Sequence, residues 1–140
     1  MTKQEHIDYW LKSADHDWDT ASHLFETGKY DWCLFISHLV IEKALKAFWV
    51  RDSEKRVPHK HNLLKIAEGT HLKLSEEQKQ FLDKIATFNI KARYPDAKFD
   101  FYKLCTKEFT TEQFEKIKEL YQWLLSQIKL EQVSKNSFGN

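Results

Sequence analysis

The residues best suited to chemistry in this 140-residue sequence form a polar line within an otherwise apolar segment. His38, Glu42 and Lys46 recur at a spacing of four residues, and Lys43 stands beside them. In an α-helix this spacing stacks the side chains on one face, and Glu42 precedes Lys46 in the order that favours an ion pair. The line is therefore either the solvent-facing edge of a helix or the polar wall of a groove shared with neighbouring helices.

A second group lies in a charged connecting segment, where His59 and His61 form a His-x-His pair. A metal site needs more ligands than these two, and nothing nearby has a conventional spacing, so we expect no metal. His61 is either a polar start to a short helix or a site residue that faces the polar line. The segment around the pair is basic, and is either a solvated connector or a surface for phosphate. Its cations are Arg51, Lys55, Arg56, Lys60 and Lys65.

A third group is the segment Arg93-Tyr94-Pro95-Asp96. The planar guanidinium of arginine suits phosphate or carboxylate, although at a helix C-terminus it also complements the helix dipole. The sequence has no Gly-rich phosphate loop, no Gly-x-Ser-x-Gly turn and no carboxylate cluster with metal spacing. We therefore expect no cofactor and assign no catalytic residue. The candidate ligand-binding or phosphate-binding residues are His38, Glu42, Lys43, Lys46, His61, Arg93 and Asp96.

Helical periodicity predicts the elements that position these side chains. A Thr2-x-x-Glu5 capping box opens the first helix, apolar residues follow every three to four positions, and Gly28 ends it. Residues 31–51 are apolar nearly all round, which is typical of a central helix. Its charged residues argue against a membrane span. A short helix is predicted over residues 61–68.

A second capping box, Ser75-x-x-Gln78, opens a helix that must end near Arg93, because Pro95 disfavours the helical conformation at Tyr94. An aromatic-rich connection of about 16 residues, 94–109, is expected to pack on the bundle. The last helix is predicted to begin at Thr110-x-x-Gln113. The fold class is therefore all-α, an up-and-down bundle of four long helices and one short helix. We expect one domain over residues 1–132 and a frayed tail over 133–140.

The charge balance limits the possible functions. Lys and Arg number 22 against 21 Asp and Glu, so any nucleic-acid binding would need a local basic patch. The two cysteines have no metal or redox spacing and fit a reducing compartment. Since the first ten residues are polar and do not resemble a signal peptide, we expect a cytoplasmic protein.

Four segments, in this order, resemble the HEPN family (higher eukaryotes and prokaryotes nucleotide-binding). They are Leu-Phe-Glu-Thr-Gly-Lys-Tyr at 24–30, Ser-His-Leu-Val-Ile-Glu-Lys-Ala-Leu-Lys-Ala at 37–47, His-Asn-Leu at 61–63 and Ala-Arg-Tyr-Pro-Asp at 92–96. The resemblance implies a bundle of four or five helices, frequently a homodimer. Many prokaryotic members pair with a minimal nucleotidyltransferase in toxin–antitoxin-like systems, and others are linked to nucleotide binding.

Many members of this family are metal-independent ribonucleases that depend on an Arg-x4–6-His motif late in the bundle. This sequence departs from that pattern, because no histidine follows Arg93 and His71 is the last one. Arg56 and His61 have the formal spacing, but they straddle Pro58 in the connector. The favoured hypothesis is a homodimeric binding module for a nucleotide, RNA or nucleotidyltransferase partner. The alternatives are a ribonuclease with His38 or His61 as substitute acid or base, and an interaction scaffold whose aromatic surplus forms a dimer interface.

Overall fold

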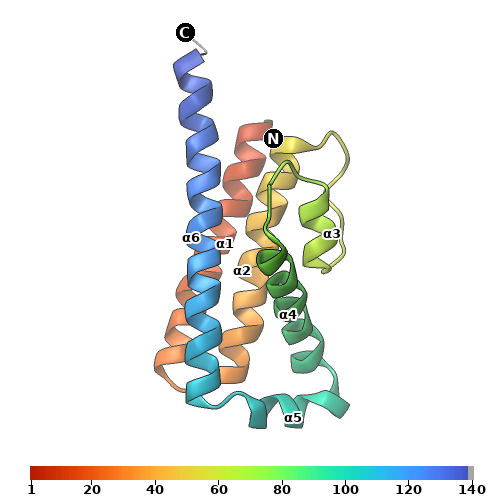
Figure 1. The fold of residues 1–140 in the computed structure, drawn as a ribbon, viewed down its shortest axis with the longest axis vertical. Coiled ribbons are helices and arrows are strands. Elements are labelled where there is room, and N and C mark those ends of the chain that lie inside the picture. The colour runs from red at the N-terminus through yellow and green to blue at the C-terminus, as the bar shows by residue number, and fades with distance from the viewer. Residues whose placement is uncertain (139–140) are drawn as a thin grey trace.

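The computed structural model describes residues 1–138, with side chains for residues 1–128. Every regular element in this described part is an α-helix: α1 Lys3–Glu26, α2 Tyr30–Asp52, α3 Leu63–Glu68, α4 Glu76–Arg93, α5 Pro95–Leu104 and α6 Lys107–Phe138. The long helices α1, α2, α4 and α6 alternate in direction, so the predicted up-and-down bundle is confirmed (Figure 1).

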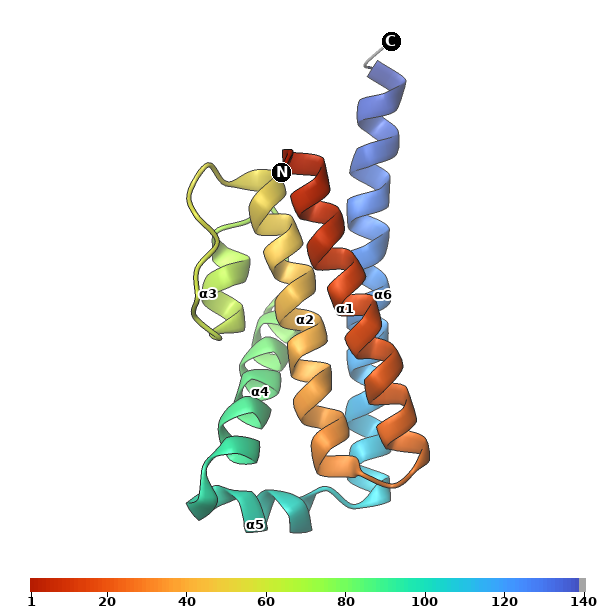
Figure 2. The ribbon, with the colours of Figure 1, turned by 180° about the vertical axis from the view of Figure 1, so that it is seen from behind.

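Helix α2 is the centre of the bundle. It contacts α1, α3, α4, α5 and α6, and Figure 2 shows α1 along one side of it with α3 and α4 along the other. Buried apolar side chains lie around its whole circumference, among them Leu34, Ile41 and Leu45, and only Trp32 near its start is among the exposed large apolar residues of the described chain. This placement confirms what the apolar composition of residues 31–51 predicted, and it means that polar side chains on α2 must find partners within the protein.

Local capping signals fix most helix ends. The Thr2 side chain accepts a hydrogen bond from the Glu5 N–H, and Ser75 and Gln78 complete a reciprocal capping box. Gly28 has φ +76°, the left-handed conformation that glycine adopts without steric cost. Asn62 caps the short helix α3, which begins two residues later than predicted.

The predicted connection over residues 94–109 is wrong, because most of it is the helix α5. Tyr94 is extended (φ −91°, ψ 128°) and ends α4, as expected, but Pro95 then serves as the first residue of a new helix. Proline is favoured there, since its missing N–H would be unpaired in any case. Helix α5 runs across the lower end of the bundle (Figure 1) and buries Phe101.

The predicted start of the last helix is wrong as well. Helix α6 begins at Lys107, and the Thr106 hydroxyl accepts the Phe109 N–H, so Thr106 takes the capping role expected of Thr110. Thr110 and Gln113 lie buried inside the helix. The backbone of α6 is helical to Phe138. The boundary at residue 132 and the tail 133–140 stay predictions, because side chains from 129 and all of 139–140 lie outside the described residues.

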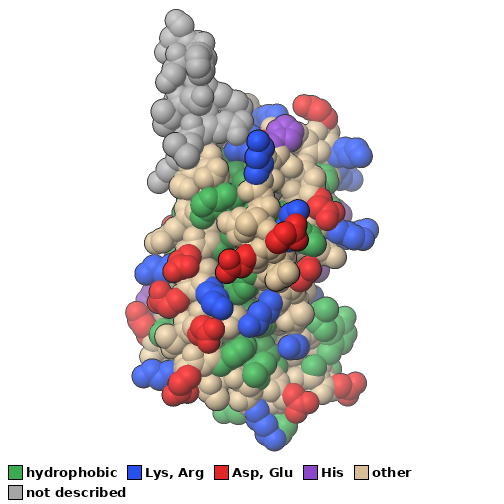
Figure 3. Space-filling view, in the orientation of Figure 1, with side chains coloured by type: hydrophobic (Ala, Val, Ile, Leu, Met, Phe, Trp, Pro, Cys, Tyr) green, Lys and Arg blue, Asp and Glu red, His purple; other side chains and the backbone are tan. Residues whose placement is uncertain are grey.

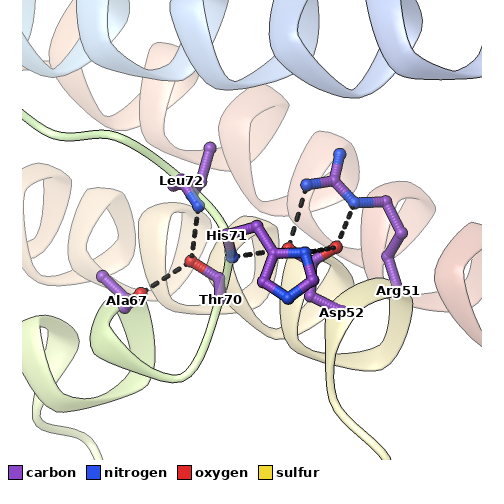
Figure 4. A network of polar contacts seen from close by, with 6 residues as sticks. All are labelled: Arg51, Asp52, Ala67, Thr70, His71 and Leu72. Atoms are coloured by element: carbon purple, nitrogen blue, oxygen red, sulfur yellow. Dashed lines mark hydrogen bonds and ion pairs between the residues drawn. The ribbon is translucent and has the colours of Figure 1, made fainter. Parts of the chain in front are cut away.

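The end of α2 is fixed to the segment after α3 by a polar network (Figure 4). The Arg51 guanidinium donates two hydrogen bonds to the Asp52 carboxylate, at 2.6 and 2.9 Å, and the His71 N–H donates a third at 2.8 Å. Burial raises the pKa of Asp52, but these donors outweigh burial and leave the pKa below its ordinary value. The network holds the two ends of the 53–70 region and so positions the connector that carries His59 and His61.

Candidate polar site on the central helix

The candidate site is organised around the Glu42 carboxylate, which is only 4% exposed. One carboxylate oxygen, Oε1, lies 2.7 Å from His61 Nδ1 and 3.9 Å from His38 Nε2. The other, Oε2, accepts a hydrogen bond from the Lys46 ammonium at 3.2 Å. Three of these residues come from α2 and the fourth from the connector. Hence the polar line is not a solvent-facing edge but an interior cluster that the connector covers.

His38 is the most buried member of this cluster, with no exposed surface. Burial lowers its pKa to about 4, although the nearby Glu42 carboxylate and the His61 carbonyl favour the charged form. Neither ring nitrogen reaches a partner with hydrogen-bond geometry in the described residues. At neutral pH His38 is therefore an uncharged imidazole, unsuited to pairing with an anion.

His61 differs from His38, because its side chain is 43% exposed. Its Nδ1 faces Glu42, so the second ring nitrogen stays available to a ligand or to solvent. A buried carboxylate that orients a half-exposed imidazole is the arrangement by which proteins fix a histidine for proton transfer or for hydrogen bonding.

Arg93, at the last position of α4, approaches the cluster from the neighbouring helix. Its exposed guanidinium lies 5.6 Å from the centre of the Phe35 ring. Phe35 precedes His38 on α2 by three residues, and the positive charge of Arg93 contributes to lowering the pKa of His38. Arg93 makes no ion pair within the described residues. Its guanidinium is thus free to bind an anion.

The other two candidates lie elsewhere. Lys43 forms an ion pair of 2.6 Å with Asp17 of α1. It follows Glu42 by one residue, so its side chain leaves α2 in a different direction from the polar line, towards α1. Asp96 is exposed in a separate depression on α5, with Lys91 and Asp100 among its neighbours. Neither residue takes part in the Glu42 cluster. Within the described residues, no group of three or more His, Cys, Asp and Glu side chains is arranged to hold a metal ion.

Comparison with protein families decides the classification: the HEPN domain model matches residues 7–128. The chain belongs to the HEPN family. A solved structure with the same fold is the crystal structure of TT1696 from Thermus thermophilus, with a TM-score of 0.74 and 20% identity. The alignment covers 86% of this chain and 96% of that one. The comparison with curated proteins found no match. No helix in the described part of this HEPN domain is long and apolar enough to cross a membrane.

One residue of the site was missed by sequence reasoning. Asn89 of α4 is 8% exposed, and its Oδ1 lacks a partner in the described residues. It lines a cavity of about 370 Å³ together with His61. The other lining residues are Lys60, Asn62, Asp83, Ala86 and Ile90. The available signal was an amide on the apolar face of α4, four residues before Arg93 and therefore one turn away from it.

Proposed function

We propose that this HEPN domain is a binding module that recognises a phosphate-bearing ligand, a nucleotide or RNA, beside the Glu42 cluster. The observation that carries the proposal is the position of Arg93, an exposed guanidinium that lies over Phe35 and makes no ion pair with any described residue. Its charge acts on His38, a member of the Glu42 cluster. A guanidinium can donate two parallel hydrogen bonds to a phosphate. His61 and Asn89, whose Oδ1 has no partner among the described residues, would supply further polar contacts nearby.

We further propose that the module acts as a homodimer through the aromatic face beside Arg93. Several large apolar side chains are 43–63% exposed around α5, and Figure 3 shows hydrophobic side chains gathered over the lower parts of α4 and α5. They are Trp32, Ile90, Tyr94, Phe99, Tyr102 and Leu104. Contiguous exposed apolar surface is typical of interaction sites. Because Arg93 adjoins this face, a two-fold interface here would bring two Arg93 side chains towards one ligand.

A minimal nucleotidyltransferase, in a toxin–antitoxin-like pair, is a second partner that the family suggests, and we propose the same face for it. A pure scaffold role would use the same face without any ligand. The oligomeric state of the isolated chain separates the nucleotidyltransferase pair from the homodimer, and the absence of any bound nucleotide or RNA separates the scaffold from the binding module. A Tyr94→Glu/Phe99→Glu variant should convert a dimer to a monomer in light scattering. The control is Tyr9→Glu, which replaces a similarly exposed aromatic (53%) on α1. A monomeric wild type would exclude the homodimer.

One observation favours the ribonuclease alternative over simple binding. Glu42 orients His61 as a carboxylate orients the histidine of a catalytic dyad, so His61, and not the buried His38, is the better substitute acid or base. His61 would accept the 2′-hydroxyl proton as the 2′-oxygen attacks phosphorus, the P–O5′ bond would break with water protonating the 5′-oxygen, and a 2′,3′-cyclic phosphate would form. Arg93 would stabilise the charge on the phosphate. RNA cleavage in the presence of a chelator, abolished by His61→Asn, would support this role. Intact RNA after prolonged incubation would exclude it.

The binding proposal is tested by calorimetric titration of the protein with adenine and guanine nucleotides and with a short single-stranded RNA. Arg93→Gln should weaken binding by roughly tenfold or more, the value of one charge-assisted contact. Lys79→Gln is the matched control, because it removes a half-exposed positive charge from the other end of α4. Binding that is equally strong in both variants would contradict the assignment to Arg93.

A further inference from the structure

A second and larger cavity lies at the opposite end of the bundle from α5. Its volume is about 910 Å³, and it is bounded by the first turns of α1, the last turns of α2 and the connector over residues 53–59. Figures 1 and 2 place these three segments side by side. Small-molecule sites in proteins commonly have volumes of about 300–1,000 Å³, so the space suits a ligand of nucleotide size.

The lining of this cavity is strongly basic. Its described members include the cations Lys3, Lys46, Lys55 and Arg56. The histidines His6 and His59 lie beside them, and Glu54 is the one carboxylate among the described lining residues. Lys3, Lys55 and Arg56 are exposed and make no ion pair with any described residue. This local concentration of unpaired positive charge contrasts with a net charge of only +1 for the whole chain.

The same cavity has an aromatic and apolar wall. Trp10 is half-buried there, and Val50, Val57 and Pro58 are further lining residues. The Trp10 Nε1 is shielded from solvent and has no hydrogen-bond partner in the described residues. A flat indole beside several cations can pack against a ring while the cations contact phosphates.

Lys46 belongs both to the Glu42 cluster and to the lining of the basic cavity. Its ammonium is hydrogen-bonded to Glu42 at 3.2 Å and lies 5.2 Å from the centre of the Trp10 ring, and it lines this cavity as well. The His-x-His pair of the connector is divided in the same way, since His59 lines the cavity whereas His61 contacts Glu42. The two sites are thus distinct but share one boundary residue.

We propose that this cavity binds a small, multiply phosphorylated compound that carries a planar ring. Lys3, Lys55 and Arg56 contact the phosphates, and Trp10 packs against the ring. The site does not rest on the proposed function at Arg93, since the two share only Lys46 as a boundary residue and Arg93 does not line this cavity. The basic segment noted in the sequence then serves as one wall of a cavity and not as a solvated connector.

The test is a titration with three probes: adenosine triphosphate, inorganic tripolyphosphate and adenosine. The expected order is strongest binding for the triphosphate that carries a ring, weaker binding for tripolyphosphate, and none detectable for adenosine. Binding should weaken as salt is raised, since exposed charges are screened. A Lys55→Gln/Arg56→Gln variant loses two charge-assisted contacts, each worth roughly tenfold or more, so it should bind at least about tenfold more weakly. Lys107→Gln/Lys118→Gln is the matched control, because it removes two exposed charges from α6.

The site is distinguished from the one at Arg93 by two further measurements. Binding here should quench tryptophan fluorescence, and Trp10→Phe should abolish the quenching, since Trp10 is the tryptophan in the described lining. Arg93→Gln should leave the quenching unchanged. No binding of any of the three probes would overturn the proposal, as would equal affinity in the Lys55/Arg56 variant and its control, or quenching that persists in Trp10→Phe.

Discussion

Replacement of Glu42 by Gln tests the polar cluster most directly, because it removes one charge and almost no volume. The change leaves Lys46, only 7% exposed, without its counter-charge, and it leaves one acceptor oxygen where Lys46 and His61 each had their own. Breaking one side of a buried ion pair costs about 3–5 kcal/mol, and since Gln keeps one acceptor oxygen we expect about 3 kcal/mol. For a domain of this size that corresponds to a fall in melting temperature of roughly 10 °C.

The chain offers a matched control for this measurement. Glu112 and Lys116 on α6 have the same spacing and an ion-pair distance of 3.3 Å, but their side chains are 63% and 52% exposed. Glu112→Gln should therefore cost less than about 0.5 kcal/mol. Both variants are compared with the wild type by urea unfolding at pH 7, followed by circular dichroism.

A double-mutant cycle with Lys46→Met separates the pair from the rest of the cluster. In Glu42→Gln/Lys46→Met no buried ammonium remains, so the double variant should be markedly more stable than the sum of the two single losses predicts. Equal losses for Glu42→Gln and Glu112→Gln, or additive losses in the cycle, would refute the conclusion that Glu42 and Lys46 form a buried pair.

Three further predictions concern the interior. The pKa of His38 is about 4 in the native state, against 6.5 for an unperturbed histidine. Between these pH values the unfolded chain binds a proton at His38 that the native protein does not. The free energy of unfolding is therefore unaffected by His38 above pH 6.5 and falls by up to about 3 kcal/mol as the pH is lowered to 4. In His38→Gln the free energy of unfolding, measured in urea, should depend less on pH between 6.5 and 4. An equal pH dependence in both proteins would contradict this. Gly69→Ala should cost about 1–3 kcal/mol in the same assay, because the new Cβ would lie 1.9 Å from Trp49 Cζ3; an unchanged midpoint would count against this contact. Burial raises the pKa of the Cys33 and Cys105 thiols to about 12, so a disulfide reagent at pH 8 should label neither in the native protein and both in urea; rapid native labelling would contradict their burial.

Much of this fold was predictable from the sequence because its signals are local. The ends of α1 and α4 are set by Thr2, Gly28 and Ser75, and the central position of α2 follows from its composition. Helix α5 was missed because Pro95 was interpreted only as the end of α4, although the same residue suits the first position of the next helix. The start of α6 was missed because Thr106 lacks the Glu or Gln three residues later that completes a capping box.

The candidate site was predictable only in part, because helical spacing does not say which neighbour a residue faces. The four-residue spacing placed His38, Glu42 and Lys46 together, because all three lie on one face of the same helix. Lys43 faces α1 instead, and that depends on how α1 packs against α2. Asn89 stands out locally only as an amide on the apolar face of α4, and its place beside His61 depends on how α4 packs against α2 and the connector.

The central position of α2 has a consequence for how this protein opens in solution. Five other helices cover α2, so its middle amides can exchange with solvent only when most of those helices have separated. The short helix α3 packs against α2 and α4, and the Asp52 network ties the connector to the end of α2, so we expect this part to open at a lower free energy than the long helices. Hydrogen exchange should therefore divide the chain into a slow unit containing α2 and a faster unit containing α3. His61 of the Glu42 cluster and His59 of the basic cavity both belong to the faster unit. Ligands could therefore reach the Glu42 cluster and the basic cavity while the long helices stay folded.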